Sequence, residues 1–226
     1  MTEIRKVDQP RQHWDRLFAT PGQLALISTV DNAGRVNCAA FATCVRVVHE
    51  PCQIAFTTSV ERKDTYANIK ANGQFVVNLP SFDRRLLEQV TICGLRFPPG
   101  VDELKKAGLT ALASKVVKPP RVAECHRHFE CEVVWTKEWV GRVMIVGNVV
   151  AASVDADCVD ERGFIKWERV KPVHFCGSPY LKQDPKPPHK HMFVGCYETM
   201  SVDTPYEGPE LDTLNKMVED MEEVEL

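Results

Sequence analysis

The segment from Ser59 to Asn78 reads SVERKDTYANIKANGQFVVN, and it joins two strand-like apolar runs through a short helix. Asp64 is a suitable N-cap for a helix over DTYANIKAN. Arg62, Lys63 and Thr65 gather where that helix begins, although a strand-to-helix junction needs neither two cations nor a hydroxyl. The unpaired N–H groups of a helix N-terminus favour anions, so this pattern predicts a site for a phosphate or a similar group.

Two interpretations of this junction stay open. In the first, Arg62 supplies a planar fork, Lys63 a point charge and Thr65 a hydroxyl donor to a bound anion. In the second, the junction is a solvated helix start with ordinary surface charges. Asp64 would repel a phosphate, so we expect its carboxylate to cap the helix or to pair with Arg62.

Strand patterns dominate on both sides of this junction. QLALISTV (23–30) and RVNCAAFATCVRVV (35–48) flank DNAG, where Gly34 suits the positive φ of a hairpin turn. Further expected strands are QIAFTTS, QFVVNL, RHFECEVVW, RVMIVGNVVAASV and KPVHFCG, and further expected helices are FDRRLLEQV and VDELKKA. Many short strands with few helices predict a mainly β (α+β) fold, a closed barrel rather than a doubly wound sheet.

Length and composition indicate a globular protein. The chain has 226 residues, of which 44% are hydrophobic and 26% charged. Nothing approaches the roughly 18–20 continuous apolar residues of a membrane helix, and the polar N-terminus lacks an apolar signal core. Nine cysteines at irregular spacings fit reduced thiols. We therefore expect a cytoplasmic protein that binds no membrane.

Charge and composition change near the C-terminus. The net charge is −3, and residues 207–226 contain eight acidic residues against one lysine, so the rest of the chain is mildly positive. That excess is too scattered for nucleic-acid binding, although it suits an anionic small molecule. KQDPKPPHKH is a Pro-rich arm, and GPELDTLNKMVEDMEEVEL is an acidic amphipathic helix that we expect to pack on the barrel or on a partner subunit. The expected organisation is a barrel domain over 1–181 and an extension over 182–226.

Several motifs occur in a specific order, and neither of the usual nucleotide-binding loops is among them. No G-x-G-x-x-G follows a strand, and no G-x-x-x-x-G-K-[ST] occurs. The motifs present are RKDTYANI (62–69), FVVN (75–78), GLRFPPGVDELKKAGLT (94–110), HFECEV, IVGNVV and KPVHFCGSPY. In this order they resemble the flavin reductase-like, FMN-binding split-barrel family, in its flavoredoxin-type branch. The resemblance covers about residues 24–181 and implies a split β-barrel that binds FMN.

The resemblance also implies the positions of the cofactor contacts. Arg62, Lys63, Asp64 and Thr65 would surround the FMN phosphate, with Ser59 nearby. The strand residues implied to line the isoalloxazine ring are Asn37, Ala39, Ala40, Phe41, Ala42, Thr43 and Cys44. Small side chains on this strand would let a flat ring lie against the backbone. Packing against a neighbouring strand is the alternative for Ala39 and Ala42.

Arg142 departs from the family pattern. Reductases of the family often have a histidine there that is associated with the nicotinamide, and Asn148 stands where they often have a glutamate. Flavin binding is compatible with both changes, whereas the use of NAD(P)H as the electron donor is open. Arg142 would either face a nicotinamide phosphate or lie exposed at the end of a hairpin, and we favour the exposed position.

Other candidate sites have less support. Cys125 and Cys131 in CHRHFEC would lie about 20 Å apart on a strand, so they cannot share one metal ion. A transition-metal site of His126 and His128 with Glu130, or with His189 and His191, is an alternative to ordinary half-buried strand residues. We expect His174, between apolar neighbours, to be a packed histidine.

These observations favour an FMN-binding oxidoreductase that transfers electrons or hydride through bound FMN. One alternative is a reductase component that supplies reduced flavin to a separate monooxygenase, and another is a metal- or ligand-binding barrel without a redox role. The resemblance implies a homodimer, with NAD(P)H or a redox protein as the electron donor.

Overall fold

The computed structural model describes residues 22–61, 64–95, 97–177 and 193–196. The main sheet contains β1 (Gln23–Val30), β2 (Val36–Val48), β3 (Gln53–Ser59), β4 (Gln74–Leu79), β7 (Arg127–Trp139), β8 (Arg142–Val154), β9 (His174–Gly177) and β10 (Phe193–Gly195). The helices are α2 (Asp64–Asn72), α3 (Arg84–Cys93), α4 (Glu103–Ala107), α5 (Trp167–Val170) and the 3₁₀ helix η2 (Ala156–Cys158). A separate ladder joins β5 (Ala111–Leu112) and β6 (Arg121–Val122).

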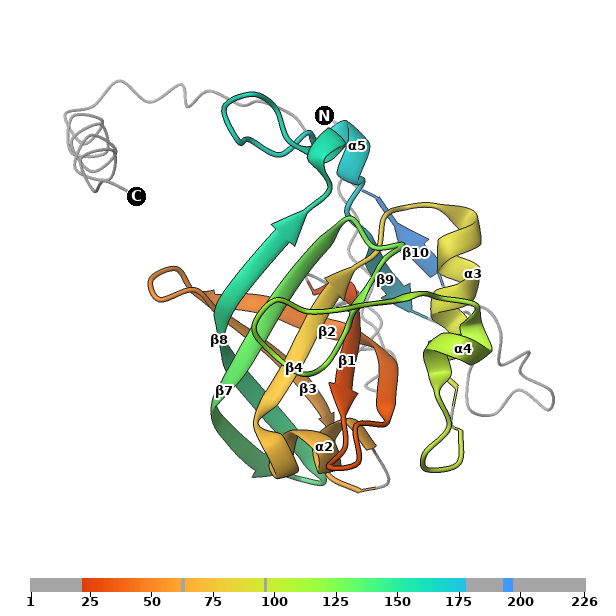
Figure 1. Cartoon of the computed structure of the whole chain (residues 1–226), viewed down its shortest axis with the longest axis vertical. Coiled ribbons are helices and arrows are strands. Elements are labelled where there is room, and N and C mark those ends of the chain that lie inside the picture. The colour runs from red at the N-terminus through yellow and green to blue at the C-terminus, as the bar shows by residue number, and fades with distance from the viewer. Residues whose placement is uncertain (1–21, 62–63, 96, 178–192, 197–226) are drawn as a thin grey trace, which may run out of the picture.

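Six strands close into a barrel in the order β1-β2-β3-β8-β7-β4 (Figure 1). The ring closes because β4 pairs antiparallel with β1 as well as with β7. β9 and β10 continue the sheet from β1, outside the closed ring. The predicted mainly β barrel with a few short helices is therefore confirmed.

Five of the ten elements predicted for the barrel domain have the expected bounds. β1, β3, α2, β4 and β8 begin and end where the sequence predicts. β7 continues beyond Trp135 to Trp139 in a long hairpin with β8, and α3 begins one residue after its N-cap Asp83, whose Oδ1 accepts from Leu86 N at 2.8 Å. The elements without a recognisable pattern are β5, β6, η2, α5 and β10, which have two to four residues each.

Part of the expected C-terminal extension joins the sheet. β10 falls within residues 182–226, and Val194 pairs with Phe175 of β9. The acidic helix expected beyond residue 207 lies outside the described residues.

The barrel interior is an aromatic core. The rings of Phe41 and Phe56 lie 5.1 Å apart, and those of Phe56 and Phe75 lie 5.3 Å apart, both tilted as aromatic pairs prefer. Gly147 on β8 allows this packing, because a Cβ built there would lie 2.7 Å from the Phe75 ring.

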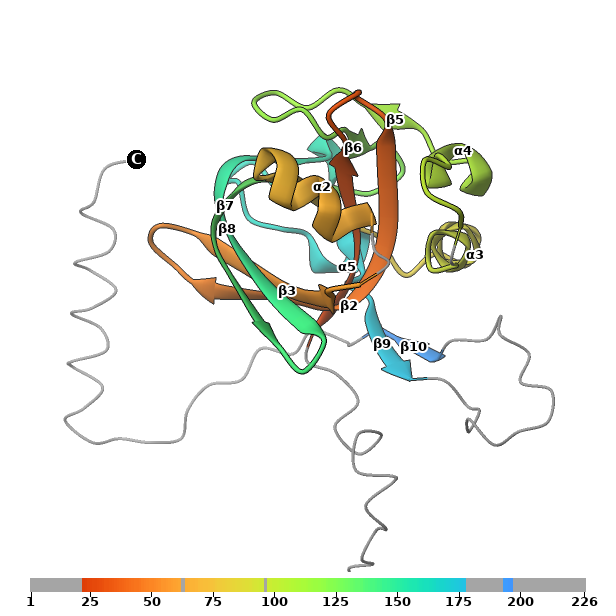
Figure 2. The same ribbon diagram turned by 90° about the horizontal axis from the view of Figure 1, so that it is seen from below.

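A second core lies outside the barrel, where α3 and α4 pack beside β1 and β2 (Figure 2). Leu26 and Cys38 from the two strands meet Leu87 and Leu104 from the two helices. Because β1 alternates between both cores, seven of its eight residues are buried.

The loop after β5 is attached to the barrel by one buried carboxylate. Glu130 on β7 is 2% exposed, and it accepts hydrogen bonds from the backbone N–H groups of Lys115, Val116 and Val117 at 2.8, 2.7 and 3.2 Å. Arg121 lies 3.9 Å from this carboxylate. Burial opposes ionisation, but these donors outweigh it, so the pKa of Glu130 is lowered.

Within the described ranges, every helix is too short or too polar to cross a membrane.

We predict that Glu130→Gln lowers the free energy of unfolding by roughly 2–3 kcal/mol at neutral pH. The substitution replaces a charged carboxylate, which accepts hydrogen bonds from three N–H groups, with a neutral amide. A carboxylate whose pKa is lowered on folding contributes its full stabilisation to the folded state above its unfolded pKa of about 4.3. This contribution disappears as the pH falls through the pKa of the carboxylate in the folded state. The difference between wild type and variant in urea unfolding should therefore shrink below about pH 4.

Glu132→Gln is the matched control, because Glu132 lies two residues along the same strand and is exposed. Equal losses for both variants, or a difference that does not change with pH, would contradict the assigned role of Glu130.

Candidate functional site

Hydrogen bonds between buried polar side chains hold helix α2 on the barrel. Asn37 Nδ2 on β2 donates to Thr65 Oγ1 on α2 at 3.1 Å and lies 3.3 Å from Thr29 Oγ1 on β1. Asn68 Nδ2 on α2 donates to the same Thr29 Oγ1 at 3.0 Å. All four side chains are buried. The network places the start of α2 directly over the start of β2.

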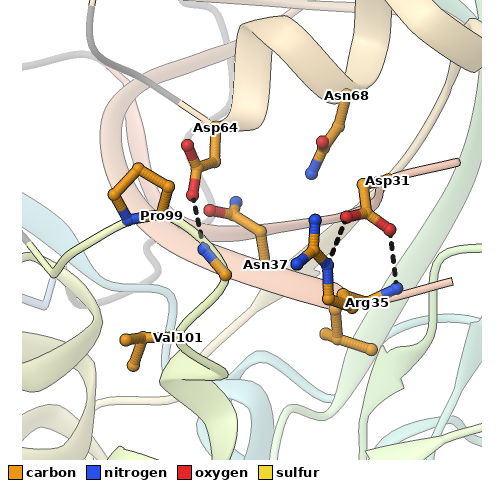
Figure 3. A pocket seen from close by; sticks show the side chains of 9 residues that line it. Asp31, Arg35, Asn37, Asp64, Asn68, Pro99 and Val101 are labelled. Atoms are coloured by element: carbon orange, nitrogen blue, oxygen red, sulfur yellow. Dashed lines mark hydrogen bonds and ion pairs between the residues drawn. The ribbon is translucent and has the colours of Figure 1, made fainter. Parts of the chain in front are cut away.

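A cavity of about 180 Å³ lies beside this network, between β2, α2 and the loop that leads to α4 (Figure 3). Its lining residues are Asp31, Arg35, Val36, Asn37, Asp64, Asn68, Pro99, Gly100 and Val101. Across the cavity, the Asp64 carboxylate accepts from Gly100 N at 3.4 Å. The sequence predicted that the Asp64 carboxylate caps the helix or pairs with Arg62. The structure shows it bonded to Gly100 N of a distant loop, and Arg62 lies outside the described residues.

The cavity contains one cation that is already paired. Asp31 accepts from the backbone N–H groups of Ala33 and Arg35 at 2.9 Å, and from Arg35 Nε at 2.6 Å. The backbone and side-chain N–H groups of Arg35 keep the pKa of Asp31 below its usual value. The cavity lining contains two acidic residues, Asp31 and Asp64, and one basic residue, Arg35, so it carries no excess positive charge. An anion bound here would therefore need positively charged residues that are not part of the lining.

The predicted phosphate-binding cations adjoin this cavity in sequence. Arg62 and Lys63 directly precede Asp64, and both lie outside the described residues. Ser59, at the end of β3, accepts a hydrogen bond from Arg142 Nη1 at 3.3 Å. Arg142 is exposed at the first position of β8, directly after the turn at Val140 and Gly141, so its predicted exposed position is confirmed.

The strand from Asn37 to Cys44 presents its side chains to both cores. Ala39, Phe41 and Cys44 lie in the barrel interior, so packing against neighbouring strands, the alternative for Ala39, is what the structure shows. Burial raises the pKa of the Cys44 thiol to about 12, which makes it a poor nucleophile. These side chains are not accessible from outside the barrel, and a ligand could meet these residues only through main-chain groups.

The rest of this strand faces outward. Ala40 packs at the border of the second core, Ala42 is half-buried and Thr43 is exposed. Thr43 Oγ1 accepts from Thr57 N at 3.0 Å, so this hydroxyl is tied to β3. A β-bulge opposite Leu24 shifts the alternation here and brings both Phe41 and Cys44 inside.

One edge of this strand is open. β3 pairs with β2 only from Val45 onward, so between residues 37 and 44 no described strand pairs with the edge that faces away from β1. Glu103 of α4, which is 7% exposed, meets this edge, where its Oε2 accepts from Cys38 N at 3.0 Å. Alternate residues of a strand point their N–H groups to the same side, so Ala40 N–H faces the same edge. The edge therefore offers main-chain donors beside a small side chain.

Glu103 is a site residue that sequence reasoning missed. Burial raises the pKa of this carboxyl, against the lowering effect of the Cys38 N–H group. The motif VDELKKAGLT marked its helix, but a Glu in a first helical turn ordinarily faces solvent. Only the packing of α4 against β2 shows its role.

The alternative metal set in CHRHFEC is not formed among the described residues. His128 bonds through Nε2 to Val122 O at 2.9 Å and through Nδ1 to Ser153 Oγ at 3.3 Å, while Glu130 binds the loop. Burial lowers the pKa of His128, as expected for a neutral structural histidine. His189 and His191 lie outside the described residues. His174 is half-buried on β9, in agreement with the expectation of a packed histidine.

Comparison with known proteins identifies a family for this chain. A family model described as "Flavin reductase like domain" matches residues 17–176. An uncharacterized protein of Aquifex aeolicus (strain VF5) is 32% identical over 167 residues, which cover 72% of this chain and 84% of that protein.

Solved structures show the same fold at lower identity. The flavoredoxin of Desulfovibrio vulgaris (Miyazaki F) has a TM-score of 0.68 at 20% identity, over 90% of this chain and 99% of that one. The 2-nitrobenzoate 2-nitroreductase NbaA of Pseudomonas fluorescens has a TM-score of 0.71 at 21% identity, over 92% of this chain and 100% of that one. From the family match over residues 17–176 and the closed barrel, we conclude that this chain belongs to the flavin reductase-like domain family.

Proposed function

We propose that the chain is an FMN-binding oxidoreductase. The observation that carries this proposal is the open edge of β2, which lies beside the N-terminus of α2 at the same side of the barrel. The Cys38 N–H group is already bonded to Glu103, so the next main-chain donor on this edge, at Ala40, suits the polar edge of a flat ring, and the helix start suits a phosphate. Membership of the flavin reductase-like family and the shared fold of a flavoredoxin support a flavin as the cofactor.

The ring would lie along the outward side of β2. Ala40 and Ala42 have small side chains on this side, and Gly94 at the end of α3 adds none. Asn37, where the polar network begins, is three residues from Ala40, which is about 10 Å along a strand. FMN, when bound, supplies the redox chemistry, and the protein supplies binding, orientation and exclusion of water.

The phosphate would lie at the start of α2. The first-turn N–H groups of a helix have no intrahelical acceptors, so they remain available to an anion. The Thr65 side chain is 1% exposed and bonded to Asn37, so we assign the phosphate contact at Thr65 to its main chain. Arg62 and Lys63 supply the positive charge that the cavity lacks.

We also propose a homodimer. Large apolar side chains are exposed on two barrel strands: Val45 and Val47 on β2 are 38% and 48% exposed, and Trp135 and Trp139 on β7 are 44% and 42% exposed. Apolar surface of this kind marks contact sites in soluble proteins.

The test of the flavin site compares FMN with riboflavin, which lacks the phosphate. We expect Arg62→Ala and Lys63→Ala each to weaken FMN binding by roughly 1.5–3 kcal/mol, the value of one charge-assisted contact, and to leave riboflavin binding unchanged. Quenching of flavin fluorescence measures both affinities.

Two further variants control this experiment. Ala40→Leu should weaken both flavins equally, because its larger side chain blocks the ring and not the phosphate. Arg84→Ala should change neither affinity, because its side chain is 93% exposed on α3. Equal losses of FMN and riboflavin in Arg62→Ala and Lys63→Ala would refute the phosphate assignment.

The dimer is tested by light scattering. The wild type should have the mass of two chains, and Trp135→Glu should have the mass of one, since a charge would be buried in the contact. Phe164→Glu, a change at a 59% exposed aromatic outside the barrel strands, should keep the mass of two chains. An unchanged mass in Trp135→Glu would place the contact elsewhere.

NAD(P)H is the electron donor that we propose, with a redox protein as the alternative. Because Arg142 is exposed and bonded to Ser59, we expect Arg142→Ala to leave the ratio of NADPH to NADH reduction rates unchanged. Anaerobic stopped-flow reduction of the FMN-loaded protein measures these rates. A loss of NADPH preference in the variant would contradict this expectation, and slow reduction by both nucleotides would favour the redox protein. Rapid release of reduced FMN would favour a component that serves a separate monooxygenase.

A further inference from the structure

Three metal-binding side chains meet at the end of the barrel opposite α2. They are His126 before β7, Asp155 after β8 and Cys158 in η2. Figure 1 shows η2's neighbour α5 at one end of the barrel and α2 at the other. This cluster therefore lies apart from the proposed flavin site and does not depend on it.

The cluster is compact. His126 Nδ1 lies 2.7 Å from Asp155 Oδ2, and the three potential ligand atoms all lie within 4.8 Å of one another. Zn²⁺ binds nitrogen, oxygen and sulfur ligands at about 2.0–2.3 Å, so ligand atoms around one tetrahedral ion lie about 3.3–3.8 Å apart. Small side-chain movements would bring the three ligand atoms to these separations.

Backbone hydrogen bonds hold the three residues together. Asp155 N donates to His126 O at 3.0 Å, and Cys158 N donates to Asp155 O at 2.9 Å. Lys166 N donates to Cys158 O at 2.9 Å, which fixes the far side of the turn. The ligand positions are thus set by the main chain and not only by flexible side chains.

We propose that His126, Asp155 and Cys158 bind a divalent transition metal, with Zn²⁺ as the preferred ion and water in the fourth position. An imidazole, a carboxylate and a thiolate together form a donor set that suits Zn²⁺. One carboxylate and one thiolate also balance the two positive charges of the ion. Three protein ligands with one solvent ligand leave the ion open to small molecules.

The surroundings of Cys158 agree with this role. Its thiol is fully buried and lies 3.6 Å from Asp157 Oδ1, a carboxylate that also pairs with Arg169. The thiol is the donor in this contact, so it carries a proton in the metal-free site. Metal binding replaces that proton: the S–H bond breaks, the Zn–S bond forms and the proton leaves to solvent.

The ion would be reached from the His126 side. The side chains of His126 and Asp155 are 27% and 43% exposed, while Cys158 is buried behind them. His126 also lines an open groove with Ser81, Arg85 and Glu124.

The test uses the full chain, freed of metal with a chelator and titrated with Co²⁺ and then Zn²⁺. Co²⁺ should produce a thiolate-to-metal charge-transfer band and the visible bands of a tetrahedral ion, and Zn²⁺ should displace it. Binding should release about one proton for each metal ion, measured with a pH indicator.

Variants assign the ligands. Cys158→Ser should abolish the charge-transfer band. Asp155→Asn and His126→Gln should each weaken Zn²⁺ binding by more than ~10–100-fold, which is the effect of losing a residue that only contacts a metal ligand. His126→Gln changes a partly exposed side chain, so it stays informative if the buried substitution Cys158→Ser prevents folding.

Matched controls use exposed residues outside the cluster. Cys176→Ser and His49→Gln should leave the spectrum and the affinity unchanged, since both side chains are exposed. An absence of the charge-transfer band in the wild type would overturn the proposal. The proposal would also be overturned if Zn²⁺ affinity were unchanged in His126→Gln and Asp155→Asn but lost in His189→Gln.

Discussion

The arrangement of this protein depends on how strand β2 uses its two edges. Along one edge β2 pairs with β1 from Val36 to Cys44, and along the other it meets β3 only from Val45 onward. Backbone N–H and C=O groups need partners, so an unpaired stretch must be satisfied by side chains, water or a ligand. Glu103 satisfies Cys38 N–H, and the remaining open edge is the feature on which the proposed flavin site rests.

Two buried carboxylates show how the number of backbone donors sets the charge of a site. Glu130 accepts from three N–H groups, and its pKa is lowered even though it is 2% exposed. Glu103, on helix α4, accepts from the N–H group of Cys38 on β2, and burial raises its pKa. The first is a fixed structural anion that attaches a loop. The second lies next to the open edge and can change its charge more easily.

The two ends of the barrel differ in chemistry. At the α2 end, buried amides and hydroxyls, including Asn37 and Thr29, position the start of a helix. At the α5 end, His126, Asp155 and Cys158 gather nitrogen, oxygen and sulfur donors. Since six antiparallel strands separate these ends, changes at one can be tested without disturbing the other.

Local sequence determined the elements of this fold, because alternating apolar residues, a helix stop at Gly73 and hairpin glycines act within a few positions. It also indicated the family, and it predicted an anion-binding site at the start of α2. Only the tertiary structure decided which side chains face inward, since the bulge between Phe41 and Cys44 breaks the alternation. The partners of Glu103, Glu130 and Cys158 come from other elements, and Gly147 is required by a ring on another strand. Such contacts join residues that are far apart in the chain, so no local pattern contains them.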